Sequence, residues 1–567
     1  MQGEATANWE NFTFYVRGQA FYDTVYDNGD FATNGGNPAF VAGYRDLNGR
    51  QSDAASNDSA YGYELMDLWV RGRFDIGANE LTVKLGQQTI SWGEALVTPL
   101  SLAQVNSFDQ SKLRVPGAEI RDAIQSMPAA LVSFDLGGGL NVEAFYQFQF
   151  RSSVTDPAGS FFSTTDVGGQ GGIGFGAKGD YDETAPDATA LALGSVSLSV
   201  PKAEYSSNSD GKNWGVAARY FSPELNNTEF GFYFANVQPR SPVPVFYTPD
   251  AANFVGVPQI GAAVTAAVTN FVISNPGATP AQIAAFQTQA TALISAQAVQ
   301  TNAKNSRIVL ENPGDVQMIG LSFNSSVDFL GMSIAGEAAL MHNLPVLVDG
   351  ETYATAFVCG IVPSATSVSC PGAYANQLSS YLGLTTNMPG ARIAGYTLED
   401  VYTFVFRGIK TFGNSDFPTY AIGANSTSLL MEFGGVYVNL PDDNVLAYDA
   451  PGNGTPGDGS WTDPLAGKYE AATDLSVGVT MVVSASYPDA LFGANLTPSV
   501  RYQTGLSGNT PLTGGYVEHA SALTFQLDVD YLLAWKGSVG YTDYFGGGRQ
   551  NLLNDRDFFQ MTFTYSF

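Results

Sequence analysis

The sequence predicts an all-β protein, a transmembrane antiparallel up-and-down β-barrel of about 16 strands, within roughly 14 to 18. Three features predict this class. Apolar and polar residues alternate along many stretches, charged residues are scarce, and the connections alternate between short and long. Side chains of a strand point to opposite faces in turn, so these stretches have one apolar and one polar face. In a membrane barrel the apolar face contacts lipid and the polar face lines a watery interior.

The end of the chain, QMTFTYSF (560–567), shows this alternation clearly. The ends of soluble proteins are commonly frayed and polar, so an apolar face that continues to the last residue needs an explanation. We expect a last membrane strand that closes the barrel against residues 10–26. Its terminal Phe567 resembles the signal that the barrel-assembly machinery reads. The apolar face consists of Phe559, Met561, Phe563, Tyr565 and Phe567.

Composition agrees with this class. Hydrophobic residues make up 44% of the chain and charged residues only 14%, against about 25% charged in soluble domains. Aromatic residues reach 13%, as interfacial aromatic girdles require. No stretch approaches the roughly 20 apolar residues of a spanning helix, so strands are expected to cross the membrane. The 53 acidic and 25 basic residues give a net charge of −28, which disfavours a nucleic-acid partner because phosphates need basic patches.

Short connections alternate with long ones along the chain, as turns and external loops of a barrel do. This alternation places both termini on the periplasmic side, in the outer membrane of a Gram-negative bacterium. A soluble β-protein has no reason to alternate in this way. The expected strands are residues 10–26, 61–75, 80–93, 129–136, 140–151, 213–222, 227–239, 315–326, 331–341, 400–411, 426–439, 470–484, 491–503, 520–531, 536–545 and 558–567.

The chain holds two cysteines, Cys359 and Cys370, in the long connection 342–399. We expect them to form a disulfide, which implies an oxidising compartment. No metal site and no cofactor are predicted, because the chain has only two histidines, His342 and His519. We expect both histidines at loop or rim positions, without an enzymatic role. The acidic loop residues Asp442, Asp443 and Asp449 could bind a divalent cation or be solvated.

The connection 94–128 carries most of the charged residues that we expect in the barrel interior. It is too apolar for a loop in free solvent, so we predict that it folds inward, narrows the pore and pairs its charges. A surface cap held by the same ion pairs is the alternative. The expected pairs are Arg114 with Glu119 and Arg121 with Asp122. The predicted pore-lining residues are Asp109, Lys112, Arg114, Glu119, Arg121 and Asp122.

An uncharged insertion, residues 251–303, is expected to form two helices in an extracellular loop. Apolar residues recur at helical spacing in 258–274 and 279–300. Thr279 is a suitable N-cap and Pro280 suits the first helical position. The insertion could be an apolar entry surface for a hydrophobic solute or a helical lid packed on neighbouring loops. The predicted apolar path consists of Phe254, Ile283, Phe286 and Leu293.

Several strings resemble a proteobacterial family of outer-membrane barrels of unknown function. The most specific are GQQTISWGEA (86–95) and LRVPGAEIRDAIQSMP (113–128). Genes of that family often accompany RND-type exporters and a periplasmic carrier, in bacteria that degrade hydrophobic compounds. The resemblance therefore implies traffic of hydrophobic or lipid-like molecules across the outer membrane.

Three functions follow as hypotheses. The first is a passive, non-enzymatic channel for hydrophobic or lipid-like solutes, in contact with membrane lipid and lipopolysaccharide. The second is the outer-membrane component of an RND-linked lipid or ester export system, supplied by a periplasmic carrier. The third is a general diffusion porin for polar solutes. A polar, wide interior favours the third function, and an obstructed interior with an apolar path favours the first two.

Overall fold

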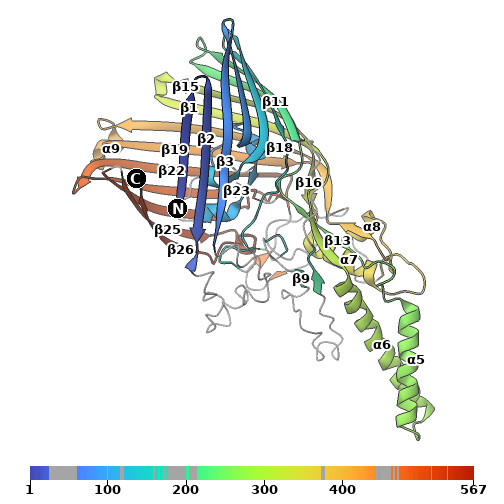
Figure 1. Ribbon diagram of the computed structural model, residues 1–567. Helices are drawn as coiled ribbons and strands as arrows, with labels where there is room; N and C mark the ends of the chain where they lie inside the picture. Colours follow the sequence, from blue (N-terminus) through green and yellow to red (C-terminus); the bar gives the residue numbers. More distant parts are fainter. Residues whose placement is uncertain are drawn as a thin grey trace.

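The computed structural model describes seventeen antiparallel strands in one large curved sheet (Figure 1). Each strand pairs with its neighbours in chain order, as in an up-and-down barrel, and the all-β class is confirmed. The described residues are 1–24, 61–98, 100–114, 120–157, 160–164, 167–169, 174–176, 199–203, 213–371, 377–441, 446, 448, 462–463, 467–468, 472–512, 514–532 and 534–566. The strands of the large sheet are β1 (Gln2–Trp9), β2 (Phe12–Tyr22), β3 (Tyr61–Ile76), β4 (Asn79–Gln88), β7 (Met127–Gly137), β8 (Leu140–Gln147), β11 (Asn213–Ser222), β12 (Thr228–Val237), β15 (Val316–Val327), β16 (Met332–Leu347), β18 (Tyr396–Gly413), β19 (Ser426–Val438), β22 (Leu475–Leu491), β23 (Ala494–Ser507), β24 (Ser521–Tyr531), β25 (Trp535–Phe545) and β26 (Phe558–Tyr565).

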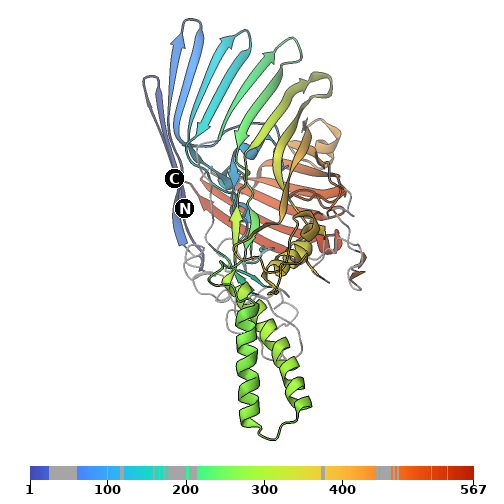
Figure 2. The ribbon, with the colours of Figure 1, turned by 90° about the vertical axis from the view of Figure 1, so that its right-hand side faces the viewer.

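The connections alternate as the sequence predicts, with tight turns at one end of the sheet and long connections at the other (Figure 2). In the turn between β3 and β4, Gly77 has a φ of +69°, which residues with a Cβ rarely adopt. The long connections carry most of the additional elements. These are η3 (Leu102–Val105), β5 (Ser107–Phe108), η4 (Gln110–Arg114), α3 (Ile120–Ala123), β6 (Ile124–Gln125), β9 (Gly174–Gly176), β10 (Ser199–Pro201), β13 (Val243–Tyr247), α5 (Val257–Ser274), α6 (Pro280–Asn305), β14 (Arg307–Glu311), α7 (Gly350–Ile361), α8 (Gln377–Tyr381), β17 (Arg392–Ala394), β20 (Thr462–Asp463), β21 (Gly467–Lys468) and η7 (Gly548–Gln550), while η5 (Asp328–Leu330) and α9 (Phe417–Ala421) lie in short connections.

Strand β1 was not expected, and it corrects two predictions. Glu10, with a φ of +52°, and Asn11 form a tight turn, so the stretch predicted as strand 10–26 belongs to a β1–β2 hairpin. The hairpin puts the N-terminus at the end of the long connections, whereas β26 ends beside the turn residue Ala534 at the other end. The two termini therefore lie at opposite ends of the sheet, and the prediction that both lie on the periplasmic side is wrong. The alternation of β1 is weak because its outward residues are mainly Gly3, Ala5 and Ala7.

Strand β2 consequently pairs with β1 along one edge and with β3 along the other. Among the described residues β26 pairs only with β25, so the predicted closure of the last strand against residues 10–26 is wrong. With an odd number of strands, the first and the last run in the same direction. Antiparallel closure, which barrels with an even number of strands use, is therefore not available to β1 and β26.

The two predicted helices of the insertion are present as α5 and α6, which form a hairpin that projects from the end with the long connections (Figures 1 and 2). Thr279 caps α6 as expected, and its hydroxyl accepts a hydrogen bond from the Gln282 amide. Helix α5 is long and apolar enough to cross a membrane, by length and composition alone. Only 11% of its residues Val257–Ser274 are buried. This differs from our expectation that no stretch approaches such a composition.

A small three-stranded sheet joins two of the long connections. Strand β13 lies between β14 and β17, and α7 packs on it through stacked rings of Phe246 and Phe357, whose centroids are 4.2 Å apart. The predicted disulfide is confirmed: Cys359 at the end of α7 is bonded to Cys370, with a Cα–Cα distance of 5.6 Å. These residues belong to a large apolar cluster that continues into the main sheet.

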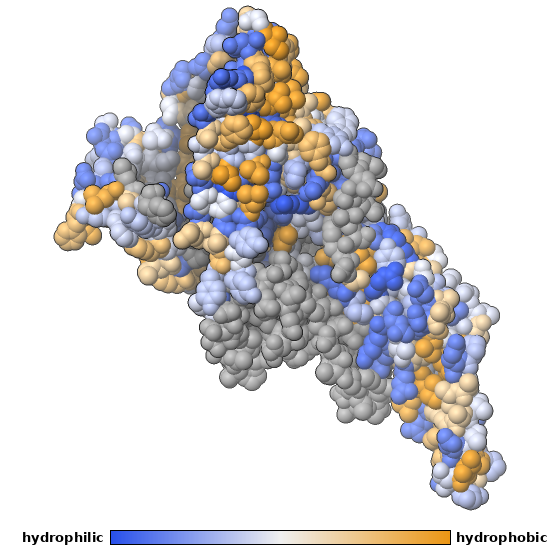
Figure 3. All heavy atoms as spheres, in the orientation of Figure 1, coloured by the Kyte–Doolittle hydropathy of each residue, from blue (hydrophilic) through white to orange (hydrophobic). Residues whose placement is uncertain are grey.

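The outer face of the sheet exposes large apolar side chains. On β26, Phe559, Met561 and Phe563 are 67%, 71% and 71% exposed, and comparable residues occur on most of the other strands. Apolar side chains also gather over the strands on the face that Figure 3 shows. Soluble monomers rarely expose apolar surface on this scale. The opposite, inner face of the sheet carries polar residues such as Gln560 and Thr562.

The position of β1 can be tested with cysteine pairs on outward-facing positions. We expect the Ala5→Cys/Val16→Cys variant to form a disulfide, because these residues are directly opposite in the β1–β2 ladder, where Cα atoms are close enough for bonding. The measurement is the mobility shift of the folded protein on a non-reducing gel, with and without a protease cut between the cysteines.

The matched control combines Val16→Cys with Met561→Cys or Phe563→Cys on β26. These pairs should stay unbonded under the same conditions, since β2 pairs with β1 and β3 and the described part of β26 pairs with β25. Efficient bonding of a control pair, together with none between positions 5 and 16, would contradict the observed strand order.

Candidate functional site

A segment between β4 and β7 runs across the inner face of the sheet. We call residues 89–108 the crossing segment; within it, Pro99 lies outside the described residues. It leaves β4, passes over β8, β11 and β12, and reaches β15, β16, β18 and β19. Strands far from β4 in sequence therefore hold it through their inward side chains.

Glu432 of β19 provides one anchor of the crossing segment. Its carboxylate accepts hydrogen bonds from the backbone N–H groups of Leu96, Val97 and Thr98 at 2.8, 3.0 and 2.7 Å. It also accepts the Thr98 hydroxyl at 2.7 Å. Glu432 is only 1% exposed. A buried carboxylate needs such donors, and hydrogen bonds to a charged group are stronger than those between neutral groups.

Glu337 of β16 provides a second anchor, and Arg407 of β18 supports it. The Glu337 carboxylate accepts the amides of Glu94, Ala95 and Leu102, the last two at 3.1 and 2.9 Å. Arg407 donates to the carbonyl oxygen of Glu94 and lies 3.3 Å from its carboxylate. The turn of the crossing segment between residues 94 and 102 is therefore fixed by two buried acids and one arginine.

The sheet has small residues where the crossing segment lies closest to it. A Cβ on Gly320 of β15 would lie 2.3 Å from a methyl carbon of Leu102. A Cβ on Gly434 of β19 would lie 2.2 Å from the Tyr516 hydroxyl and 2.9 Å from that of Thr98. Only glycine fits at these two positions without movement of the segment.

Trp92 fixes the first part of the crossing segment. Its ring lies between Phe145 of β8 and Tyr233 of β12, with centroids 4.9 and 5.2 Å away. The indole N–H donates to Glu143 at 2.7 Å, and Arg219 lies 3.5 Å from the same carboxylate. The indole is thus held by packing and by one directed hydrogen bond.

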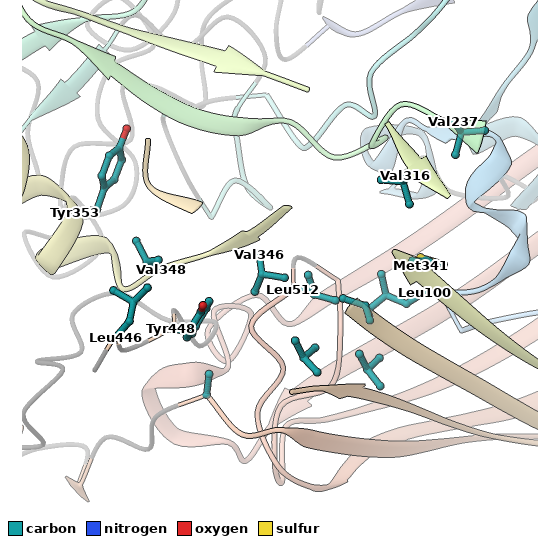
Figure 4. Close-up of a cluster of buried hydrophobic side chains, with 14 of the residues drawn as sticks. Leu100, Val237, Val316, Met341, Val346, Val348, Tyr353, Leu446, Tyr448 and Leu512 are labelled. Carbon is teal, nitrogen blue, oxygen red and sulfur yellow. The ribbon is translucent and has the colours of Figure 1, made fainter. Parts of the chain in front are cut away.

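The last part of the crossing segment returns towards β7 through the short helix η3. Arg240 and Gln147 donate to the carbonyl oxygen of Val105 at 2.6 and 3.0 Å. Leu100, Leu102 and Val105 are buried in the large apolar cluster. Figure 4 shows Leu100 in this cluster with Met341, Val316 and Val237. Polar contacts position the backbone, while apolar packing covers it.

The structure gives partners to some of the predicted pore-lining residues. Lys112 pairs with Glu64 of β3 and lies 4.0 Å from Asp109. Burial raises the pKa of the Asp109 carboxyl, and hydrogen bonds from Ser111 oppose this rise. Asp122 accepts from Arg17 of β2 at 3.0 Å.

The pairs that we predicted within the connection are not established. Glu119 lies outside the described residues, and Arg114 is described only as the last residue of η4. The carbonyl oxygen of Arg121 accepts from Arg17 at 3.4 Å, so Arg17 bonds both Arg121 and Asp122. The described residues of the connection contain only the short helices η3, η4 and α3.

The four predicted apolar-path residues do not form one cluster of contacts. Phe254 is buried ahead of α5, whereas Phe286 stacks on Phe271 of the facing helix at 4.2 Å. Ile283 and Leu293 are partly exposed on α6. Whether a solute passes them stays a prediction.

The two histidines and the acidic loop residues add no further anchor. His342 lies inside β16, with Nδ1 2.5 Å from an Asp400 oxygen, and His519 lies in the connection before β24. Asp442, Asp443 and Asp449 lie outside the described residues. In the part of the chain that the structure describes, no group of three or more metal-ligating side chains occurs.

Sequence reasoning missed the two anchoring acids, although a signal was present. Glu337 in SIAGEAAL and Glu432 in LLMEFGG are single carboxylates within apolar strands. A carboxylate in a membrane strand is costly unless it faces the interior and has a partner. Each therefore indicated a partner inside the barrel, but not which segment supplied it.

Removal of an anchoring acid tests the hold on the crossing segment. We expect Glu432→Ala to release the segment, because three backbone N–H groups lose their acceptor at about 1–3 kcal/mol for each buried group left unpaired. Single-channel conductance in a planar bilayer should rise and fluctuate, and trypsin should cut at Lys112 sooner.

The matched control is Glu80→Ala, which removes a half-exposed carboxylate 3.9 Å from Arg73 near the tight turns. It should leave conductance and cleavage unchanged. Equal behaviour of the Glu432→Ala variant and the wild-type protein would show that Glu432 does not hold the segment.

Comparison with solved structures finds porins at low similarity. OpdK of Pseudomonas aeruginosa, solved with vanillate, is 8% identical with a TM-score of 0.33, covering 100% of this chain and 91% of that chain. OccK9 (OpdG) of the same organism is 10% identical with a TM-score of 0.34, covering 100% and 88%. A mutant porin of Rh. blastica is 8% identical with a TM-score of 0.27, covering 100% of both chains.

Comparison with curated protein sequences finds no match. A family model, described as a protein of unknown function (DUF1302), matches residues 1–567. The chain therefore belongs to the DUF1302 family.

Proposed function

We propose that this protein is an outer-membrane channel of a Gram-negative bacterium that conducts hydrophobic or amphipathic small molecules passively. The observation that carries the proposal is the crossing segment, which the buried acids Glu337 and Glu432 hold over the inner face of the sheet. Such a segment narrows the passage that a closed sheet would enclose.

The membrane location is supported by the two faces of the sheet. The outward side chains of β26 are aromatic or Met and highly exposed, whereas Gln560, Thr562 and Thr564 point to the inner face. This is the pattern of a barrel strand between lipid and water. Contact with membrane lipid and lipopolysaccharide is part of the same proposal.

The preference for apolar solutes is supported by side chains next to the narrowed passage. Leu96 in the crossing segment and Leu113 five residues after its end are 41% and 47% exposed, although the backbone N–H of Leu96 is bound to Glu432. Exposed leucines beside a watery path offer a surface on which an amphipathic molecule can partition. Binding and partition, without covalent chemistry, are then sufficient for passage.

The second candidate is the outer-membrane component of an RND-linked lipid or ester exporter. The projecting α5–α6 hairpin favours it, because its uncharged surface lies away from the sheet (Figure 2). A periplasmic carrier and an RND-type transporter would then deliver the cargo. A general porin for polar solutes is the third candidate, and a crossing segment that leaves a wide polar passage would favour it.

Uptake into reconstituted vesicles tests the proposal. Vesicles loaded with albumin receive a fluorescent fatty-acid analogue from outside, and trapping by albumin gives the rate. We expect the protein to accelerate this uptake well above the rate of protein-free vesicles, while swelling in the sugar raffinose stays slow.

The Glu337→Ala/Glu432→Ala variant should increase raffinose swelling, because release of the crossing segment widens the passage. The Glu80→Ala variant serves as the control and should resemble the wild type in both assays. Fast raffinose entry through the wild-type protein, with no acceleration for the fatty-acid analogue, would favour the general porin and contradict the proposal.

A further inference from the structure

Several basic side chains on the inner face have an acidic partner. This is expected in a chain with 53 acidic and 25 basic residues. Two neighbouring cations on this face without a carboxylate carry positive charge that an anionic ligand can balance. The paired examples are Arg17 with Asp67, Lys112 with Glu64, Arg219 with Glu143 and Arg407 with Glu94.

Arg71 of β3 and Lys84 of β4 are different. They are directly opposite in the β3–β4 ladder and point to the inner face together with Trp69. Within the described ranges, neither has a carboxylate oxygen within ion-pair distance, and Lys84 Nζ has no hydrogen-bond acceptor. Arg71 makes one long contact, 3.5 Å from Nη2 to the Thr13 hydroxyl, and its buried Nε has no partner in the same part of the chain.

An aromatic surface lies beside these two cations. Lys84 Nζ and the Arg71 guanidinium carbon are 4.4 and 5.7 Å from the centroid of the Trp69 ring. The Tyr15 ring stacks on Trp69 at 5.0 Å with an interplanar angle of 26°. Cation–π contacts orient both positive groups, but they leave the N–H donors available for an anion.

The acids nearest to this position are engaged elsewhere. Asp67 binds Arg17 and the Ser126 hydroxyl, and the Glu4 carboxylate accepts the Tyr15 hydroxyl at 2.7 Å. Glu143 binds Trp92 and Arg219. Among the described residues, these acids therefore do not neutralise Arg71 and Lys84 by direct contact.

We propose that Arg71, Lys84 and Trp69 form a binding site for the carboxylate of an amphipathic organic anion. This inference rests on the proposed function and narrows its substrate class. The guanidinium and the ammonium groups receive the carboxylate. The apolar body of the anion lies over Trp69 and Tyr15, which offer a flat surface next to the charge.

The position of the site in the fold agrees with a role in passage. Lys84 lies in β4 between the tight turn at residues 77–78 and the start of the crossing segment at residue 89. The site is therefore on the turn side of the narrowed region. A solute that moves through the interior would meet the two cations before or after the crossing segment, depending on its direction.

The test measures binding of two probes to the full-length protein in detergent micelles by calorimetry. The probes are 2-naphthoate and its neutral counterpart 2-naphthylmethanol, which share the ring and differ in charge. We expect the Arg71→Gln/Lys84→Met variant to bind 2-naphthoate at least about tenfold more weakly, as loss of charge-assisted hydrogen bonds implies. Binding of the alcohol should change little.

The matched control is Lys410→Met, which removes another lysine that lies over an aromatic ring, 5.0 Å from the centroid of Phe412. It should leave both affinities unchanged. Trp69→Leu should weaken both probes, because it removes the surface for the ring. Heat-modifiable migration on a detergent gel checks that each variant is folded.

A second measurement does not depend on any variant. Wild-type affinity for 2-naphthoate should fall as salt increases, whereas affinity for the alcohol should not, since salt screens only the charged interaction. Equal salt dependence, or 2-naphthoate affinity within twofold of wild type in a folded double variant, overturns the proposed site. If the proposed site is overturned, vesicle uptake of the fatty-acid analogue decides whether the channel function fails as well. If the wild-type protein still accelerates this uptake, only the site is wrong; if it does not, the proposed channel function is also wrong.

Discussion

The arrangement of the interior depends on two buried carboxylates that accept backbone N–H groups. Glu337 and Glu432 together bind six amides and one hydroxyl of a segment that begins on the opposite part of the sheet. Neither acid could remain charged inside the protein without these donors, and the segment would have unpaired amides without the acids. Each side therefore stabilises the other, and the sheet and the crossing segment must fold together.

Other features of the interior accommodate the crossing segment that these hydrogen bonds hold on the sheet. Glycines at positions 320 and 434 allow the segment to approach the strands, and Trp92 fills the space over β8 and β12. Several inner-face cations pair with acids, whereas the neighbouring Arg71 and Lys84 have no ion pair among the described residues. The outer face has no such constraints and needs only apolar side chains that contact lipid. The proposed function therefore depends on the inner face.

Sequence reasoning identified what depends on local pattern and missed what depends on distant contacts. Alternation predicted the sheet, and helical spacing with the Thr279 cap predicted α6. The same reasoning overlooked β1, because Gly3, Ala5 and Ala7 give little apolar contrast, and so it misplaced the N-terminus and the closing pair. It also did not predict that Asp122 binds Arg17, more than 100 positions away in sequence. Partners at such separations cannot be read from spacing.

The most direct test of the account is a disulfide between the crossing segment and the far side of the sheet. Thr98 and Gly434 are in contact, with 2.9 Å between the Thr98 hydroxyl and a Cβ built on Gly434. Tyr516→Phe is included because its hydroxyl would lie 2.2 Å from that Cβ. We expect the Thr98→Cys/Gly434→Cys/Tyr516→Phe variant to form this bond in the folded protein, without added oxidant, while Cys359 and Cys370 remain bonded to each other. Failure to form it in heat-modifiable protein, while Ala5→Cys/Val16→Cys bonds normally, would contradict a crossing segment held on β19.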